Sequence, residues 1–64
     1  MKIKRINNGK YTFKDDFMEG YITHDLNEPN QFKMWKVYCK DEEGHFIEEF
    51  KGHTLKACKT WVLE

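Results

Sequence analysis

The sequence lacks long hydrophobic segments, and its longest apolar runs have three residues, at positions 37–39 and 61–63. A membrane-spanning helix needs about 20 apolar residues, and the apolar region of a signal peptide needs about 7–15. The sequence therefore predicts no membrane segment, and we expect the protein in the cytoplasm. Only two cysteines occur, without Cys-x-x-Cys spacing, which fits a reducing compartment better than a disulfide framework.

Residues with the spacing of a metal or catalytic site are also missing. His24, His45, His53, Cys39 and Cys58 show none of the short paired spacings of a structural zinc site, and both cysteines fall on predicted core faces. No Gly-rich phosphate loop and no H-E-x-x-H or G-x-S-x-G motif occurs. We expect no metal, no cofactor and no catalytic residues, so the protein is not predicted to be an enzyme.

What the chain does have is a short length with many aromatic residues. Its 64 residues predict a single domain, residues 1–64, near the lower limit for unaided folding. Hydrophobic residues make up 39% of the chain and aromatic residues 16%, so a few large side chains must form the core.

Charge is segregated along the chain although the formal net charge is zero. Residues 1–14 contain five basic residues and no acid, and residues 15–31 contain five acids and no Lys or Arg. The two segments could lie side by side and form ion pairs. Alternatively, the basic segment binds nucleic acid, or the acidic segment binds a basic partner.

The first basic segment predicts a β-hairpin around Asn8-Gly9, a sequence that favours a type I′ turn. A two-residue loop there pairs Ile6 with Tyr11 and Lys4 with Phe13, which collects Ile6, Tyr11 and Phe13 on one face. Residues 14–20 are expected to turn, residues 21–24 to form a short strand, and residues 25–30 to form a loop around the only proline.

Residues 32–40 show the clearest alternation, with Trp35, Val37 and Cys39 on one face of a strand. Residues 41–44 are expected to turn the chain into a second strand. The register that we predict pairs Cys39 with Phe46, Val37 with Glu48, Trp35 with Phe50, Tyr38 with Ile47, and Lys36 with Glu49.

The last segment predicts a helix that begins after the N-cap residue Thr54. Its apolar side chains, from Leu55 to Val62, share about half the helix circumference, and so short a helix must pack on the sheet. The predicted fold class is α+β, with an antiparallel sheet of three to five strands and one C-terminal helix on one face. The other face is either covered by the N-terminal hairpin or left open.

The second hairpin and the helix resemble a known family. Trp35-x-Val37, Asp41-x-x-Gly44, Phe50, Thr54 and Trp61 are similar to the pattern of the amino-terminal arm-binding domains of phage and transposon tyrosine integrases. The resemblance covers residues 35–62 and implies DNA binding through a sheet on one helix. The second strand departs from that family's basic strands, because it carries two adjacent glutamates. The residues fit a small phage-type protein of the same architecture equally well.

The sequence favours a non-catalytic binding module over any other class. Our first hypothesis is a phage or mobile-element accessory protein that binds a host protein. The first alternative is a DNA-binding module, and the second is a structural homodimer, so monomer and homodimer both stay open. The predicted partner-binding residues are Met34, Lys36, Tyr38, Ile47 and Glu49. The residues predicted for the nucleic-acid alternative are Lys2, Lys4, Arg5, Lys10 and Lys36.

Overall fold

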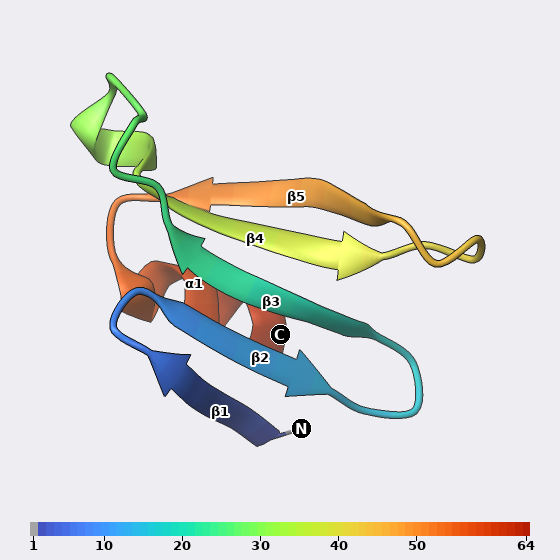
Figure 1. Cartoon of the computed structure of the whole chain (residues 1–64). Coiled ribbons are helices and arrows are strands. Elements are labelled where there is room, and N and C mark those ends of the chain that lie inside the picture. Colours follow the sequence, from blue (N-terminus) through green and yellow to red (C-terminus); the bar gives the residue numbers. More distant parts are fainter. Residues whose placement is uncertain (1) are drawn as a thin grey trace.

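The computed structural model describes residues 2–64 and has five strands and one helix packed on them. The strands form one antiparallel sheet in which each strand pairs with the next along the chain. In Figure 1 the helix α1 lies behind this sheet. The elements are β1 (Lys2–Asn7), β2 (Lys10–Lys14), β3 (Glu19–His24), a 3-10 turn η1 (Gln31–Lys33), β4 (Trp35–Lys40), β5 (Phe46–Gly52) and α1 (Leu55–Leu63). The predicted α+β class and the C-terminal helix are confirmed.

The core lies between α1 and the central strands. Its buried side chains come from β2, β3, β4 and α1, and they are Phe13, Ile22, Val37, Cys58 and Val62. Thr54 caps the helix, because its hydroxyl accepts a hydrogen bond from the Ala57 amide at 3.1 Å. At the end of β5, Gly52 permits close packing, since a Cβ there would lie 3.1 Å from the Cys58 sulfur.

The first hairpin turns at the predicted residues, Asn8 and Gly9, but its turn type and register differ from the prediction. Gly9 has a φ of +93°, whereas no non-glycine among residues 2–64 has positive φ, so the turn is not type I′. A bulge between Arg5 and Asn7 leaves Ile6 unpaired and 53% exposed. Ile3 therefore pairs with Phe13 on the core side, and the predicted placement of Ile6 is wrong.

The turn of the second hairpin is organised by Asp41. Its carboxylate accepts hydrogen bonds from the amides of Glu43 and His45, at 2.9 and 2.8 Å, and its own amide donates to the His45 carbonyl. Gly44 has a φ of +89°, which a glycine adopts without strain. The first pair of this hairpin is consequently Lys40 with Phe46, whereas the predicted register pairs Phe46 with Cys39.

A bulge opposite Val37 and Tyr38 shifts the second hairpin again and leaves Glu49 without a partner on β4. None of the predicted pairs is observed, so the predicted register is wrong along the whole of this hairpin. The observed pairs are Trp35 with Gly52, Lys36 with Lys51, Val37 with Phe50, Tyr38 with Glu48, Cys39 with Ile47, and Lys40 with Phe46. Because side chains alternate along a strand, Ile47 lies on the helix side with Cys39, and Phe46 and Glu48 lie on the opposite side.

The N-terminal hairpin extends the sheet sideways and does not fold over its second face (Figure 1). Of the two arrangements left open by the sequence, the structure has the uncovered one. We call the sheet surface opposite α1 the open face. Within residues 2–64, no helix has the length and hydrophobicity needed to cross a membrane.

Candidate functional site

Alternating residues of all five strands point to the open face in cross-strand rows. The middle row runs from Lys4 through Thr12, Tyr21 and Tyr38 to Glu48. A second row, toward one end of the strands, joins Lys2, Lys14 and Glu19. A third row, toward the other end, joins Lys10, Thr23, Lys36 and Lys51. Lysines, hydroxyls and aromatic rings thus share one surface.

An aromatic cluster of Tyr21, Tyr38 and Phe46 lies at the centre of the open face. The rings of Tyr21 and Tyr38 stack with centroids 4.9 Å apart, and Phe46 is tilted against Tyr21 at 5.2 Å. Burial, with a smaller effect of Tyr38, raises the pKa of Tyr21 above its usual value, so its phenol stays neutral. A neutral phenol can donate a hydrogen bond to an anion.

Four lysines surround this cluster on the β1–β2 side, and we call Lys2, Lys4, Lys10 and Lys14 the lysine group. All four are exposed, and within the described chain no carboxylate lies within ion-pair distance of their amines. The amine of Lys10 lies 4.8 Å from the centroid of the Tyr21 ring. The nearby acid, Glu19, is 3.9 Å from Lys40. The lysine group therefore presents four ammonium groups without an ion-pair partner to solvent, beside one carboxylate, that of Glu19, which pairs with Lys14 across the sheet.

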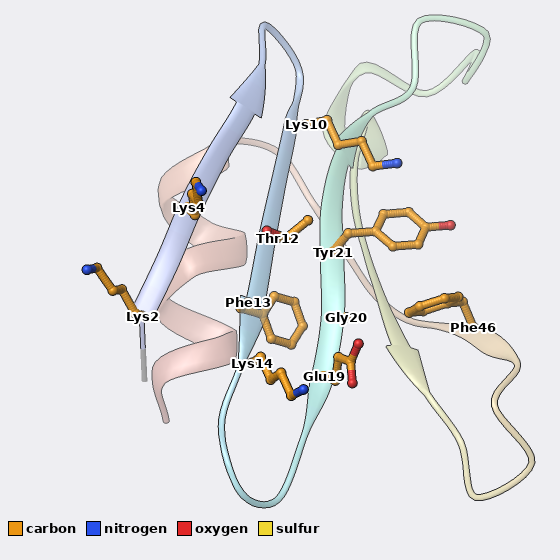
Figure 2. A pocket seen from close by; sticks show the side chains of 10 residues that line it. All are labelled: Lys2, Lys4, Lys10, Thr12, Phe13, Lys14, Glu19, Gly20, Tyr21 and Phe46. Carbon is orange, nitrogen blue, oxygen red and sulfur yellow. The ribbon is translucent and has the colours of Figure 1, made fainter.

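A shallow pocket of about 550 Å³ lies between the lysine group and the aromatic cluster. Figure 2 shows that Lys10, Thr12, Tyr21 and Phe46 line it from β2, β3 and β5. Its volume is within the range of ligand sites, roughly 300–1,000 Å³. The pocket brings ammonium groups and a ring into reach of one ligand.

On the β4–β5 side of the open face, in the same row as Lys10, lies Lys36, which is only 9% exposed. Its amine lies 2.7 Å from Asp25, 3.0 Å from Glu28 and 3.8 Å from Glu48. The hydrogen bond to Lys36 holds the pKa of Asp25 and of Glu28 below their usual values, and the same two bonds raise the pKa of Lys36. Lys36 thereby fastens the β3–β4 loop to the sheet and is withdrawn from contact with a ligand.

The predicted partner-binding residues do not form one surface. Tyr38 is on the open face, Ile47 is on the helix side, and Glu49 occupies the bulge. Met34 precedes β4, where its carbonyl accepts a hydrogen bond from the Asp25 amide at 2.7 Å. Glu49 is not the partner of Lys36, contrary to the predicted pair, because Lys36 faces Lys51.

More of the residues predicted for nucleic-acid binding than of those predicted for partner binding share one surface. Lys2, Lys4 and Lys10 belong to the lysine group, whereas Arg5 pairs with Tyr11 on the other side of the sheet and donates to the Asn8 side chain. The sequence prediction missed Lys14, Thr12 and Phe46. The alternation of polar residues in β2 could have indicated the first two, but Phe46 depends on the β5 register.

Asp41, Glu43 and His45 place their ligand atoms within 4.8 Å of one another in the β4–β5 turn. The Asp41 carboxylate already accepts two turn amides, and His45 is 3.7 Å from Glu43. These contacts account for the group as a hairpin turn, and we assign no metal to it. Burial raises the pKa of the Cys58 thiol to about 11, so this sulfur is a core group.

The open face thus combines ammonium groups, hydroxyls and aromatic rings, which are groups that contact phosphates and bases. No protein-family model, curated protein or solved structure matches this chain.

Proposed function

We propose that this protein binds nucleic acid, without catalysis, through the open face of its sheet. The observation that carries the proposal is the lysine group, whose four amines share one uncovered surface with hydroxyl and aromatic side chains. Phosphates attract such amines, and binding releases the counterions that had neutralised the nucleic acid. The resemblance of residues 35–62 to integrase arm-binding domains favours the same class of partner.

The formal net charge of zero does not oppose this proposal, because charge is unevenly distributed on the surface. Three carboxylates gather around Lys36 on the β4–β5 side of the sheet. This separation leaves the lysine group with a local excess of positive charge, which acts within a Debye length of about 8–10 Å. A nucleic acid at the open face therefore meets the lysine group and not the average charge of the protein.

The affinity should depend steeply on salt. If all four amines neutralise a phosphate, the slope of log affinity against log salt is about −2.8 for a single strand and about −3.6 for a duplex. Raising salt from 50 to 200 mM then weakens binding by roughly 50- to 150-fold. Fluorescence anisotropy of labelled oligonucleotides measures this slope directly.

A charge-matched pair of variants tests whether the lysine group carries the binding. Lys4→Gln with Lys14→Gln removes two charges from the open face, and Lys33→Gln with Lys56→Gln removes two exposed charges from η1 and α1. The first variant should bind more weakly, with a salt slope reduced by about 1.4 for a single strand and about 1.8 for a duplex. The second should bind like the unchanged protein. Equal effects of both variants would show that only overall charge matters and would refute the proposed surface.

A protein partner, such as a host factor bound by a phage or mobile-element protein, is the second candidate. It is favoured by β5, an outer strand with Phe46 and Ile47 exposed by 44% and 48%. Such an edge can accept an extended segment of a partner as an additional strand. Ile47→Lys should then abolish capture of that partner and leave nucleic-acid binding unchanged, because Ile47 lies on the helix side. Loss of both activities would argue against two separate surfaces.

A further inference from the structure

The pocket beside Phe46 bears on whether the nucleic acid is single-stranded or double-stranded. Tyr21 has a neighbour on each side, because Tyr38 stacks on it from β4 and Lys10 approaches it from β2. Neither side of that ring is free for a further partner. Phe46 is different, since it lies at the end of the cluster, lines the pocket and is 44% exposed.

The lysines on the other side of the pocket lie on two neighbouring strands. Lys2 and Lys4 are two residues apart on β1, which separates them by about 7 Å, and Lys14 is the direct partner of Lys2 on β2. Figure 2 shows these side chains on the pocket side opposite Phe46. A ligand that contacts both sides needs phosphates along one border and an accessible ring on the other.

From this geometry we infer that the partner is single-stranded nucleic acid, with one unpaired base against Phe46 and neighbouring phosphates on Lys2, Lys4 and Lys14. In a duplex the faces of the bases are covered by their stacked neighbours, so only a single strand can offer a base face to Phe46. The inference rests on the proposed function and narrows it to one substrate class.

The charges on the sheet also indicate the path of the bound nucleic acid. On the β4–β5 side, Lys36 and Lys51 face Asp25, Glu28 and Glu48, so three negative charges oppose two positive ones. Because these lysines are already paired, phosphates bind here less readily than at the lysine group. The single-stranded nucleic acid therefore runs along β1 and β2, past the pocket, and avoids the β3–β4 loop.

The test compares a labelled 12-nucleotide oligothymidylate with a 12-base-pair duplex at equal salt, by fluorescence anisotropy. The inference requires the single strand to bind at least about fivefold more tightly, which is the lower limit for stacking of one base. Phe46→Ala should weaken single-strand binding by about 5- to 160-fold with an unchanged salt slope, and Phe46→Tyr should restore it. The matched control is Phe17→Ala, at a phenylalanine 96% exposed in the β2–β3 turn, which should bind like the unchanged protein.

Each other outcome is decisive. Equal or tighter duplex binding, or Phe46→Ala with unchanged affinity, would overturn the inference and leave the proposed function in place. Absence of binding to both oligonucleotides at low salt would overturn the proposed function itself. If thymidine monophosphate competes at concentrations comparable to the oligothymidylate, the pocket takes a free nucleotide and the single-strand inference is wrong. Far-UV circular dichroism of each variant confirms that it is folded.

Discussion

Replacing Ile22 by alanine provides a quantitative test of the core. Ile22 is fully buried on β3, where it pairs with Tyr11 on one side and Val37 on the other. The change removes three carbon atoms, which contribute about 2.4 kcal/mol at about 0.8 kcal/mol each. The cavity left behind raises the expected loss in free energy of unfolding to about 3–4 kcal/mol.

This loss is large for a chain of 64 residues, because such a domain has a total stability of roughly 3–10 kcal/mol. Urea denaturation followed by far-UV circular dichroism measures it. Ile6→Ala is the matched control, since Ile6 sits in the β1 bulge and is 53% exposed. That variant should lose no more than about 0.5 kcal/mol. A loss at Ile6 equal to that at Ile22 would refute the observed hairpin register and support the simple two-residue turn.

Three further predictions follow from the sheet. Gly20→Ala should destabilise the protein by about 3 kcal/mol in urea denaturation, because the new Cβ would overlap the backbone carbonyl of Tyr38. Near-normal stability would contradict this close approach. The pKa values of Asp25 and Glu28 lie below their usual 3.8 and 4.5, so the free energy of unfolding should fall as pH drops below about 5. Lys36→Met should flatten this pH dependence, and an equally steep curve for the variant would contradict the assigned ion pairs. A face-to-face dimer would oppose two copies of the lysine group, so sedimentation at low salt should give a monomer at two concentrations. A dimer that forms through the open face would refute that reasoning.

The helix was predictable because its signals are local. A threonine N-cap and the apolar spacing after it are sufficient to define where α1 starts and which side it buries. The general order of turns and strands was predictable for the same reason. These features depend on residues that are neighbours in the chain.

The registers were not predictable from alternation, because two bulges interrupt it. One lies at Ile6 and inverts the predicted faces of the residues before it in β1, and the other lies at Glu49 and shifts the pairing of β5 by a further residue. Phe46 was expected under the helix but lies on the open face, because the Asp41 turn makes Lys40 its partner in place of Cys39. A single unpaired residue leaves no clear mark in the sequence.

The candidate site was partly predictable from charge. Lys2, Lys4 and Lys10 stood out as members of a basic segment, and they share the open face. Lys36 was misassigned because its carboxylate partners Asp25 and Glu28 approach only through the folded β3–β4 loop. Such a tertiary contact cannot be obtained from the pattern of one strand.

The most direct test of the central claim is a two-dimensional NMR titration of labelled protein with oligothymidylate at low and moderate salt. The proposed surface predicts chemical-shift changes at Lys4, Lys14, Tyr21 and Phe46 that diminish as salt is added. A spectrum that does not change at low salt, or changes confined to α1, would contradict nucleic-acid binding by the open face.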